Sequence, residues 1–172
     1  MAAESVKVVL SGEGADELFG GYPYYQECLA FAPYMMVPAP ARRALAAAAR
    51  HLPEGTHGRR FLMRGAHPLP ERYIRLEYNF PWAEALDLLA PELGARCAAA
   101  PTPWELAAPL FAEIEADEIT AMQTADILTW MQQDILLKAD KMSMTSSLEL
   151  RVPFLDREVF ALASTLPASQ RV

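Results

Sequence analysis

A short apolar run, Val6-Lys7-Val8-Val9-Leu10, is the feature of this sequence that most constrains its fold. Its β-branched residues and the Ser-Gly pair that follows them predict one buried strand over residues 6–10. No second strand is evident elsewhere, and a single strand cannot form a sheet. The sequence therefore predicts a mainly α-helical chain with one short N-terminal strand. We expect it to be a fragment of a larger α/β domain whose other strands lie upstream.

Helices are expected to make up most of the remaining chain. The longest periodic segment covers about residues 111–138, where Ile127, Met131 and Ile135 recur every four residues and predict one buried helix face. Asp156 is placed to cap the last helix, which Pro167 ends. Further helices are predicted at 16–19, 24–35, 41–51, 59–65, 70–78 and 157–166, with loops at 52–58 and 91–104.

Composition excludes several classes of protein. The chain has 172 residues, of which 52% are hydrophobic and 22% charged, so it is not disordered and fits one domain. Two cysteines exclude a disulfide framework. The longest uncharged run, residues 28–41, is too short and too interrupted by proline to span a membrane. The N-terminus has no signal-peptide pattern, so we expect a cytoplasmic protein without a membrane partner.

Charge is unevenly distributed along the chain. The formal net charge is −7, which disfavours general nucleic-acid binding, and no nucleic-acid partner is expected. Residues 42–75 nevertheless carry eight arginines and two acids. They are consistent either with solvated helix faces or with a local patch that binds anions.

The segment that carries chemistry directly follows the predicted strand and spans Ser11 to Tyr22, with the sequence SGEGADELFGGY. Glycines after a strand allow the backbone to turn sharply and approach a ligand, and a following helix N-terminus attracts anions. The same turn contains three carboxylates, Glu13, Asp16 and Glu17. They fit a phosphate site only if a cation such as Mg²⁺ lies between them and the phosphate. The alternative is a glycine turn whose acids stabilise the helix dipole. Neither a P-loop nor a dinucleotide fingerprint is present.

Two long motifs in this order resemble the asparagine synthetase family. Residues 11–22 resemble its S-G-[ED]-G-x-D-E-L-F-x-G-Y motif. Residues 134–156 are similar to its D-x-L-x-K-x-D-[RK]-x-S-M…S-x-E-x-R-x-P-F-L-D motif. Residues 52–59 and 68–73 resemble the bacterial glutamine-hydrolysing members. The resemblance therefore covers nearly the whole chain.

This resemblance implies a fold, a reaction and its substrates. The fold would be the PP-loop ATPase-like (adenine-nucleotide α-hydrolase) synthetase domain. The enzyme would be a ligase of asparagine and amino-acid biosynthesis that uses ATP and Mg²⁺. Aspartate would react with ATP to give an aspartyl-adenylate and pyrophosphate. Ammonia from a glutaminase domain of the same glutamine amidotransferase protein would then displace AMP.

The resemblance also implies roles for individual residues. Ser11 and Gly12 would lie against the nucleotide, Glu13 would support the intermediate and the proton transfer, and Asp16 would help to hold Mg²⁺ and pyrophosphate. A substrate pocket would take further residues, namely Glu17, Glu149 and Arg151. For Glu17 the alternative is a residue that stabilises the helix dipole. For the other two it is a buried ion pair that holds the turn at Pro153-Phe154.

Parts of the family pattern are not found in these 172 residues. They contain neither a glutaminase domain with its N-terminal cysteine nor the Ser-Gly-Gly-x-Asp-Ser pyrophosphate loop. A catalytic lysine is expected beyond the last residue. The sequence therefore predicts that residues 1–172 form a partial synthetase domain, truncated at both ends and inactive in isolation. An open strand edge makes a homodimer possible.

Other functions remain open on the sequence alone. A relative that closes a β-lactam or a peptide lactam would use the same adenylation chemistry. Glu13 favours the synthetase, because the β-lactam-forming relatives carry a tyrosine at that position. A non-catalytic helical interaction module is the alternative from a different class.

Overall fold

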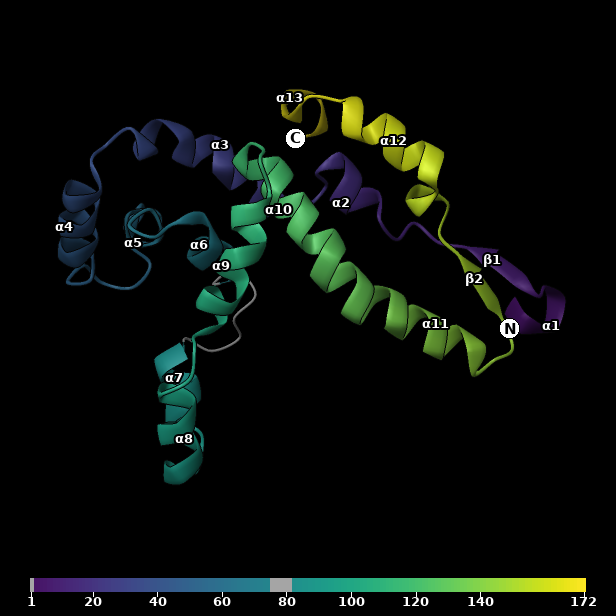
Figure 1. Cartoon of the computed structure of the whole chain (residues 1–172), viewed down its shortest axis with the longest axis horizontal. Coiled ribbons are helices and arrows are strands. Elements are labelled where there is room, and N and C mark those ends of the chain that lie inside the picture. Colours follow the sequence, from purple (N-terminus) through teal and green to yellow (C-terminus); the bar gives the residue numbers. More distant parts are fainter. Residues whose placement is uncertain (1, 75–81) are drawn as a thin grey trace. The chain divides into compact units, whose positions relative to one another are not determined.

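The computed structural model describes residues 2–74 and 82–172, most of which are helical (Figure 1). The chain divides into two compact units. One unit consists of residues 1–27 and 116–172, and the other consists of residues 28–115. Among the described residues, no helix is long and apolar enough to cross a membrane.

A two-stranded parallel sheet lies in the first unit. Strand β1 (Val8–Leu10) pairs with β2 (Glu149–Arg151), and Val9 is the register partner of Leu150. The prediction of a single strand was therefore wrong, and this partner lies downstream of β1. The strand was also predicted to be buried, yet Leu10 is 73% exposed because only alternate residues face the protein. The result is a mostly helical chain with one small parallel sheet, as expected for part of an α/β domain.

The other elements of the first unit are helices. They include two non-α segments, a π-helix (η1) within the long helix and a 3₁₀ turn (η2) after β2. The elements are α1 (Ala2–Ser5), α2 (Ala15–Phe19), the start of α3 (Pro23–Met35), α10 (Glu118–Asp126), η1 (Ile127–Ile135), α11 (Leu136–Met144), η2 (Pro153–Leu155), α12 (Arg157–Thr165) and α13 (Ala168–Arg171).

The long helix runs from Glu118 to Met144 rather than over residues 111–138. A break at residues 114–117 separates it from α9 (Pro103–Glu113), and Asp117 caps its new start. The predicted buried face is confirmed, because Met131 is 1% exposed and both Ile127 and Ile135 are half-buried. The last predicted helix and its cap are also confirmed, since the Asp156 side chain accepts a hydrogen bond from the Glu158 N–H at 2.8 Å.

We expect Asp117→Ala to lower the free energy of unfolding by about 1 kcal/mol at pH 7, because it removes this cap. The Asp117 carboxylate accepts hydrogen bonds from the backbone N–H groups of Ile119 and Thr120, both at 3.0 Å. Burial opposes its ionisation, but these bonds and the positive charge of Arg171 lower its pKa overall. A lowered pKa stabilises the fold above the unfolded-state pKa, and this contribution is lost as the pH falls through the folded-state pKa.

Urea denaturation of wild type and Asp117→Ala at several pH values tests this expectation. The difference in the free energy of unfolding between wild type and Asp117→Ala should become smaller below about pH 4. Glu115→Ala, which removes an exposed carboxylate two residues earlier, is the matched control and should change little. A difference that stays constant down to the lowest pH would contradict the assigned charge effect.

Helices are the regular elements of the second unit in its described residues. Helices at 82–87 and 91–98 were not predicted, and the second of them occupies much of a segment expected to be a loop. The predicted helix at 70–78 begins as expected, but its residues 75–78 lie outside the described residues. The helices, after the end of α3, are α4 (Ala39–Ala49), α5 (Arg59–Arg64), α6 (Leu69–Ile74), α7 (Trp82–Asp87), α8 (Pro91–Ala98) and α9.

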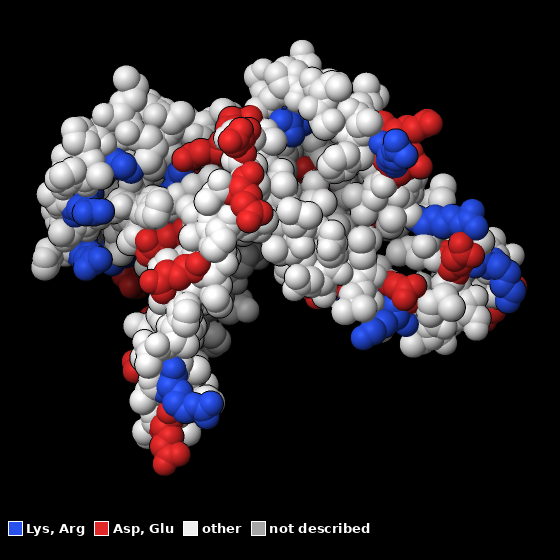
Figure 2. Space-filling view, viewed as in Figure 1, with Lys and Arg blue, Asp and Glu red and all other residues white. Residues whose placement is uncertain are grey.

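Aromatic side chains form the core of the second unit. The rings of Phe31 and Phe61 stack with centroids 4.5 Å apart, and the Arg72 guanidinium lies 4.7 Å from the Phe31 ring centroid. Arg42 donates to the backbone carbonyls of Val37 and Gly65 at 3.0 and 2.7 Å. Two of the arginines in the basic segment therefore serve the fold. In Figure 2, the basic side chains over α4 form separate spots rather than one continuous patch.

Candidate functional site

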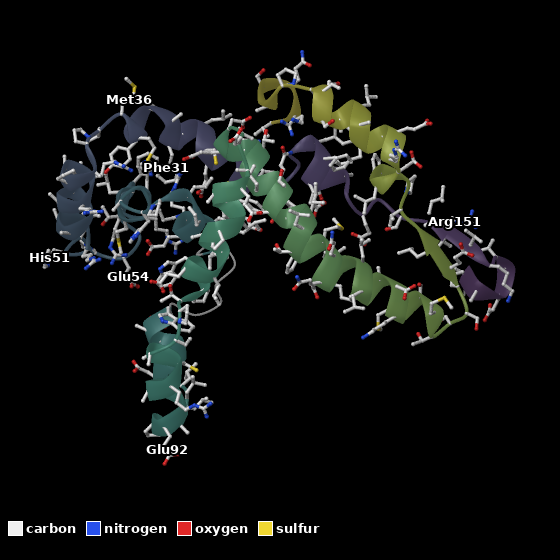
Figure 3. The ribbon with its side chains drawn as sticks, viewed as in Figure 1. Phe31, Met36, His51, Glu54, Glu92 and Arg151 are labelled. Carbon is white, nitrogen blue, oxygen red and sulfur yellow. The ribbon has the colours of Figure 1, made fainter. Side chains whose placement is uncertain are left out.

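The strand pairing brings the two sequence motifs together within the first unit. Because β1 and β2 are parallel, both strands end at the same edge of the sheet, where ligands bind in α/β proteins. The Ser11 N–H donates to the Arg151 carbonyl at 2.9 Å, one residue beyond the end of β1. Figure 3 labels Arg151 on β2, beside β1. The segment 11–16, here called the acidic loop, therefore begins next to the segment 152–156.

The end of the second motif supports the acidic loop. Gly14 has a φ of +90°, which disfavours any residue with a side chain, and a Cβ there would overlap the side chain of Leu155. The Phe19 and Phe154 rings meet edge to face with centroids 6.2 Å apart. Gly14 is therefore required by the fold, because the chain must turn sharply while η2 packs against it.

Gly12 has the opposite character, since the fold does not require a glycine there. Its φ lies outside the left-handed region, and a Cβ built on it would meet nothing within 4 Å. Ser11 and Glu13 on either side are half-buried, whereas Gly12 itself is exposed. The acidic loop thus has open space over its backbone, into which a bound group could approach closely.

Asp16 is exposed on the first turn of α2, and its carboxylate lies beside a glycine. A Cβ at Gly21 would overlap Asp16 Oδ1, so the glycine makes room for this side chain. The Gly21 N–H also donates to the Asp16 carbonyl at 3.0 Å. The second glycine of the Gly20-Gly21 pair therefore leaves the space that the Asp16 carboxylate occupies.

Glu17 points away from Asp16 into the interior. It is 1% exposed, and its carboxylate accepts a hydrogen bond from the Tyr22 hydroxyl at 3.0 Å. Burial raises the pKa of Glu17, and the nearby charges of Asp126 and Asp16 act in the same direction. Its role in a substrate pocket stays a prediction, and in this chain it packs beneath the acidic loop.

Glu149 and Arg151 form an ion pair at 2.8 Å, but the pair is not buried. Their side chains are 56% and 62% exposed, so the expectation of a buried pair was wrong. Three-residue strands place alternate side chains on the same face, and on β2 that face is open. An exposed pair contributes little to stability, so both side chains can rearrange around a ligand.

The donor set fits Mg²⁺ only with help from a ligand. No group of three or more potential metal-binding side chains occurs in the parts of the chain that the structure describes. Mg²⁺ is often held by one or two carboxylates together with substrate phosphates and water, which suits the exposed Asp16 carboxylate with Glu13 nearby in sequence. The expected helix-dipole contribution is small, because α2 has only five residues.

Several residues that hold the acidic loop were missed in the sequence. Leu155 packs on Gly14, and the Gln123 side-chain amide donates to the Leu18 carbonyl at 3.4 Å. Asp126, 2% exposed, accepts from the hydroxyls of Tyr24 and Tyr25. A lone acid among apolar neighbours on the long helix was a detectable signal for Asp126, whereas its partners lie about a hundred residues away in the sequence.

The fold and site define a mostly helical chain with a small parallel sheet, in which a glycine-containing acidic loop follows the end of β1. The family model described as asparagine synthase matches residues 1–172. The chain belongs to this family. Its resemblance to the asparagine synthetases, predicted from the two motifs, is confirmed.

Individual relatives agree with the family assignment. The chain is 47% identical over 175 residues to proteins of Mycobacterium bovis and Mycobacterium tuberculosis (strain H37Rv), both provisionally named glutamine-hydrolysing asparagine synthetases. It is 45% identical over 170 residues to asparagine synthetase [glutamine-hydrolyzing] 1 of Bacillus subtilis. These alignments cover 99%, 99% and 96% of this chain but 26% of each relative, so the chain spans about a quarter of their length. No solved structure matches the chain.

Proposed function

We propose that the protein to which these residues belong makes asparagine from aspartate, ATP and glutamine-derived ammonia. The observation that carries the proposal is the parallel pairing of β1 with β2, which puts both family motifs at one edge of the sheet. Open space at Gly12 and an exposed Asp16 carboxylate support a phosphate-bearing substrate at that edge. The names of the relatives support asparagine as the product.

In the proposed reaction, each residue of the acidic loop has a separate task. The backbone at Ser11 and Gly12 lies against ATP, while the aspartate side-chain carboxylate attacks the α-phosphate and pyrophosphate leaves. Ammonia then attacks the aspartyl-adenylate, AMP leaves, and the Glu13 carboxylate takes the proton that the nitrogen must lose. Asp16 would help to hold Mg²⁺, which neutralises charge on the phosphates when it is bound.

The deciding experiment measures pyrophosphate release by the complete protein with Mg-ATP and ammonia, with and without aspartate. Release that depends on aspartate, with asparagine as product, would support the proposal. Release that responds to another carboxylic acid instead would point to a lactam-forming or other amide-forming relative. No release with any carboxylic acid would reject the enzyme and favour a helical interaction module.

We further propose that residues 1–172 do not make asparagine by themselves. The family's Ser-Gly-Gly-x-Asp-Ser pyrophosphate loop does not occur among them. The same assay on the 172-residue chain, at matched concentration, tests this, and aspartate-dependent release by that chain would contradict it.

Gly21→Ala is expected to raise the Mg²⁺ concentration needed for half-maximal activity about tenfold, through displacement of the Asp16 carboxylate. The φ of Gly21 lies outside the left-handed region, so alanine is tolerated by the backbone, and the new Cβ meets the Asp16 side chain. The measurement is the rate of pyrophosphate release against Mg²⁺ at fixed ATP.

Two comparisons make the Gly21→Ala result specific. Asp16→Asn should also raise the Mg²⁺ concentration needed for half-maximal activity, because it removes the charge of the Asp16 carboxylate. Asp87→Asn, on the exposed surface of α7, should leave the Mg²⁺ dependence unchanged. Wild-type Mg²⁺ dependence in both Gly21→Ala and Asp16→Asn would remove Asp16 from the proposed site.

A further inference from the structure

A buried cluster of tyrosines and carboxylates lies beneath the acidic loop, in the same compact unit. Asp126, the last residue of α10, is 2% exposed and Tyr25 is fully buried. The Tyr24 hydroxyl donates to Asp126 Oδ2 at 2.9 Å, and the Tyr25 hydroxyl donates to the same oxygen. One carboxylate oxygen therefore fixes two consecutive residues at the start of α3.

The tyrosines extend this contact to α2. Tyr22 stacks on Tyr24 with ring centroids 5.2 Å apart and an interplanar angle of 14°. The Tyr22 hydroxyl in turn donates to Glu17, whose carboxylate is buried on the inner side of α2. Asp126 is thus connected to α2 through three tyrosine side chains, with no break in the chain of contacts.

A second contact from the same helix reaches the backbone of α2. Gln123, one turn before Asp126 and 2% exposed, donates to the Leu18 carbonyl. Gln123 also accepts a hydrogen bond from Arg171, which further donates to Thr120. Helix α10 therefore contacts the buried part of α2, whereas Asp16 on the first turn of α2 is exposed.

We propose that Asp126 is a positioning residue for the acidic loop. It keeps Glu13 and Asp16 in the orientation that catalysis needs. The inference rests on the proposed function for its catalytic consequence. Asp126 acts through Tyr24, Tyr25 and Tyr22 rather than by touching a substrate. A small displacement of catalytic groups is costly in rate, so loss of this support should lower kcat more than it alters substrate binding.

The test uses the complete protein with Asp126→Ala, Asp126→Asn and Tyr34→Phe. Asparagine has an amide oxygen that can still accept both hydroxyl hydrogen bonds, so it serves as the rescuing variant. Tyr34→Phe is the matched control for loss of a buried tyrosine hydroxyl, since that oxygen has no hydrogen-bond partner among the described residues. If Asp126→Ala does not fold, Tyr24→Phe replaces it, because it removes one of the two donors and leaves the carboxylate.

Two readouts are compared, the kinetics with ammonia and the amide hydrogen exchange of residues 11–22 against residues 157–165. We expect Asp126→Ala to lower kcat about tenfold with KM for ATP nearly unchanged, and to speed exchange in residues 11–22 selectively. Asp126→Asn should restore most of kcat and most of the slow amide exchange in residues 11–22. Tyr34→Phe should change neither kcat nor this exchange. Exchange that rises equally in both segments, with kcat of the folded enzyme unchanged, would overturn the proposal.

These readouts separate the two proposals from each other. If the wild-type protein makes no asparagine, the proposed function fails, while the exchange comparison still decides whether Asp126 holds the acidic loop. If wild type is active but the variant shows unaltered exchange and kinetics, the proposed function stands and the positioning role is rejected.

Discussion

Replacing Glu13 by glutamine is expected to lower asparagine formation by the complete protein about 10²- to 10⁴-fold, the range for loss of a general base. Glutamine keeps the size of the side chain but cannot accept the proton that the attacking nitrogen must release. Glu13 lies half-buried in the acidic loop, next to the open space over Gly12. The substitution should therefore leave the fold intact, and the melting temperature should stay close to that of wild type.

Separate measurement of pyrophosphate and asparagine sharpens this prediction. A residue needed mainly for proton removal should lower asparagine formation more than pyrophosphate release, because adenylation precedes the attack of ammonia. Glu158→Gln, which replaces an exposed glutamate in the first turn of α12, is the matched control and should retain full activity. Equal asparagine rates for wild type and Glu13→Gln would exclude Glu13 as the base.

Alanine at Gly12 and alanine at Gly14 are expected to have opposite effects. Gly12→Ala should lower kcat/KM for ATP by about 10²-fold, because its Cβ would occupy the space over the loop backbone. Its free energy of unfolding should change little, since that Cβ meets no protein atom within 4 Å. The kinetic assay and urea denaturation are carried out on the same preparations.

Gly14→Ala should instead destabilise the fold by about 2–4 kcal/mol, from left-handed strain together with overlap with a neighbouring side chain. The overlap is with Leu155, and φ at this position is +90°. The two glycines thus serve as controls for each other, being two residues apart in one loop. If Gly12→Ala bound ATP as wild type does, the space over Gly12 would not be part of the nucleotide site.

The acidic loop could be predicted from the sequence because its signals are local. Glycines, carboxylates and the preceding apolar run occur within about fifteen residues, and the predicted strand and short helix are where they were expected. The caps at Asp117 and Asp156 are local in the same way. Their side chains bond to N–H groups two or three residues later.

The parts that could not be predicted depend on distant contacts or on ambiguous residues. Strand β2 has three residues and becomes a strand only by pairing with β1, which is far away in the sequence. The loop predicted at residues 91–104 contains Pro91 and Pro103, but each is the first residue of a helix, where proline is favoured. The support given by Asp126 depends on tyrosines that no nearby pattern connects to it.

The register of β1 with β2 has a consequence for the order of folding. The paired strands are separated by about 140 residues, so their pairing closes a very large loop and raises the contact order. During synthesis, residues 28–115 leave the ribosome before β2 and can become compact first. Insertions or deletions within those residues would lengthen or shorten the closed loop at small entropic cost. Sequence length in that region can therefore change while the acidic loop keeps its geometry.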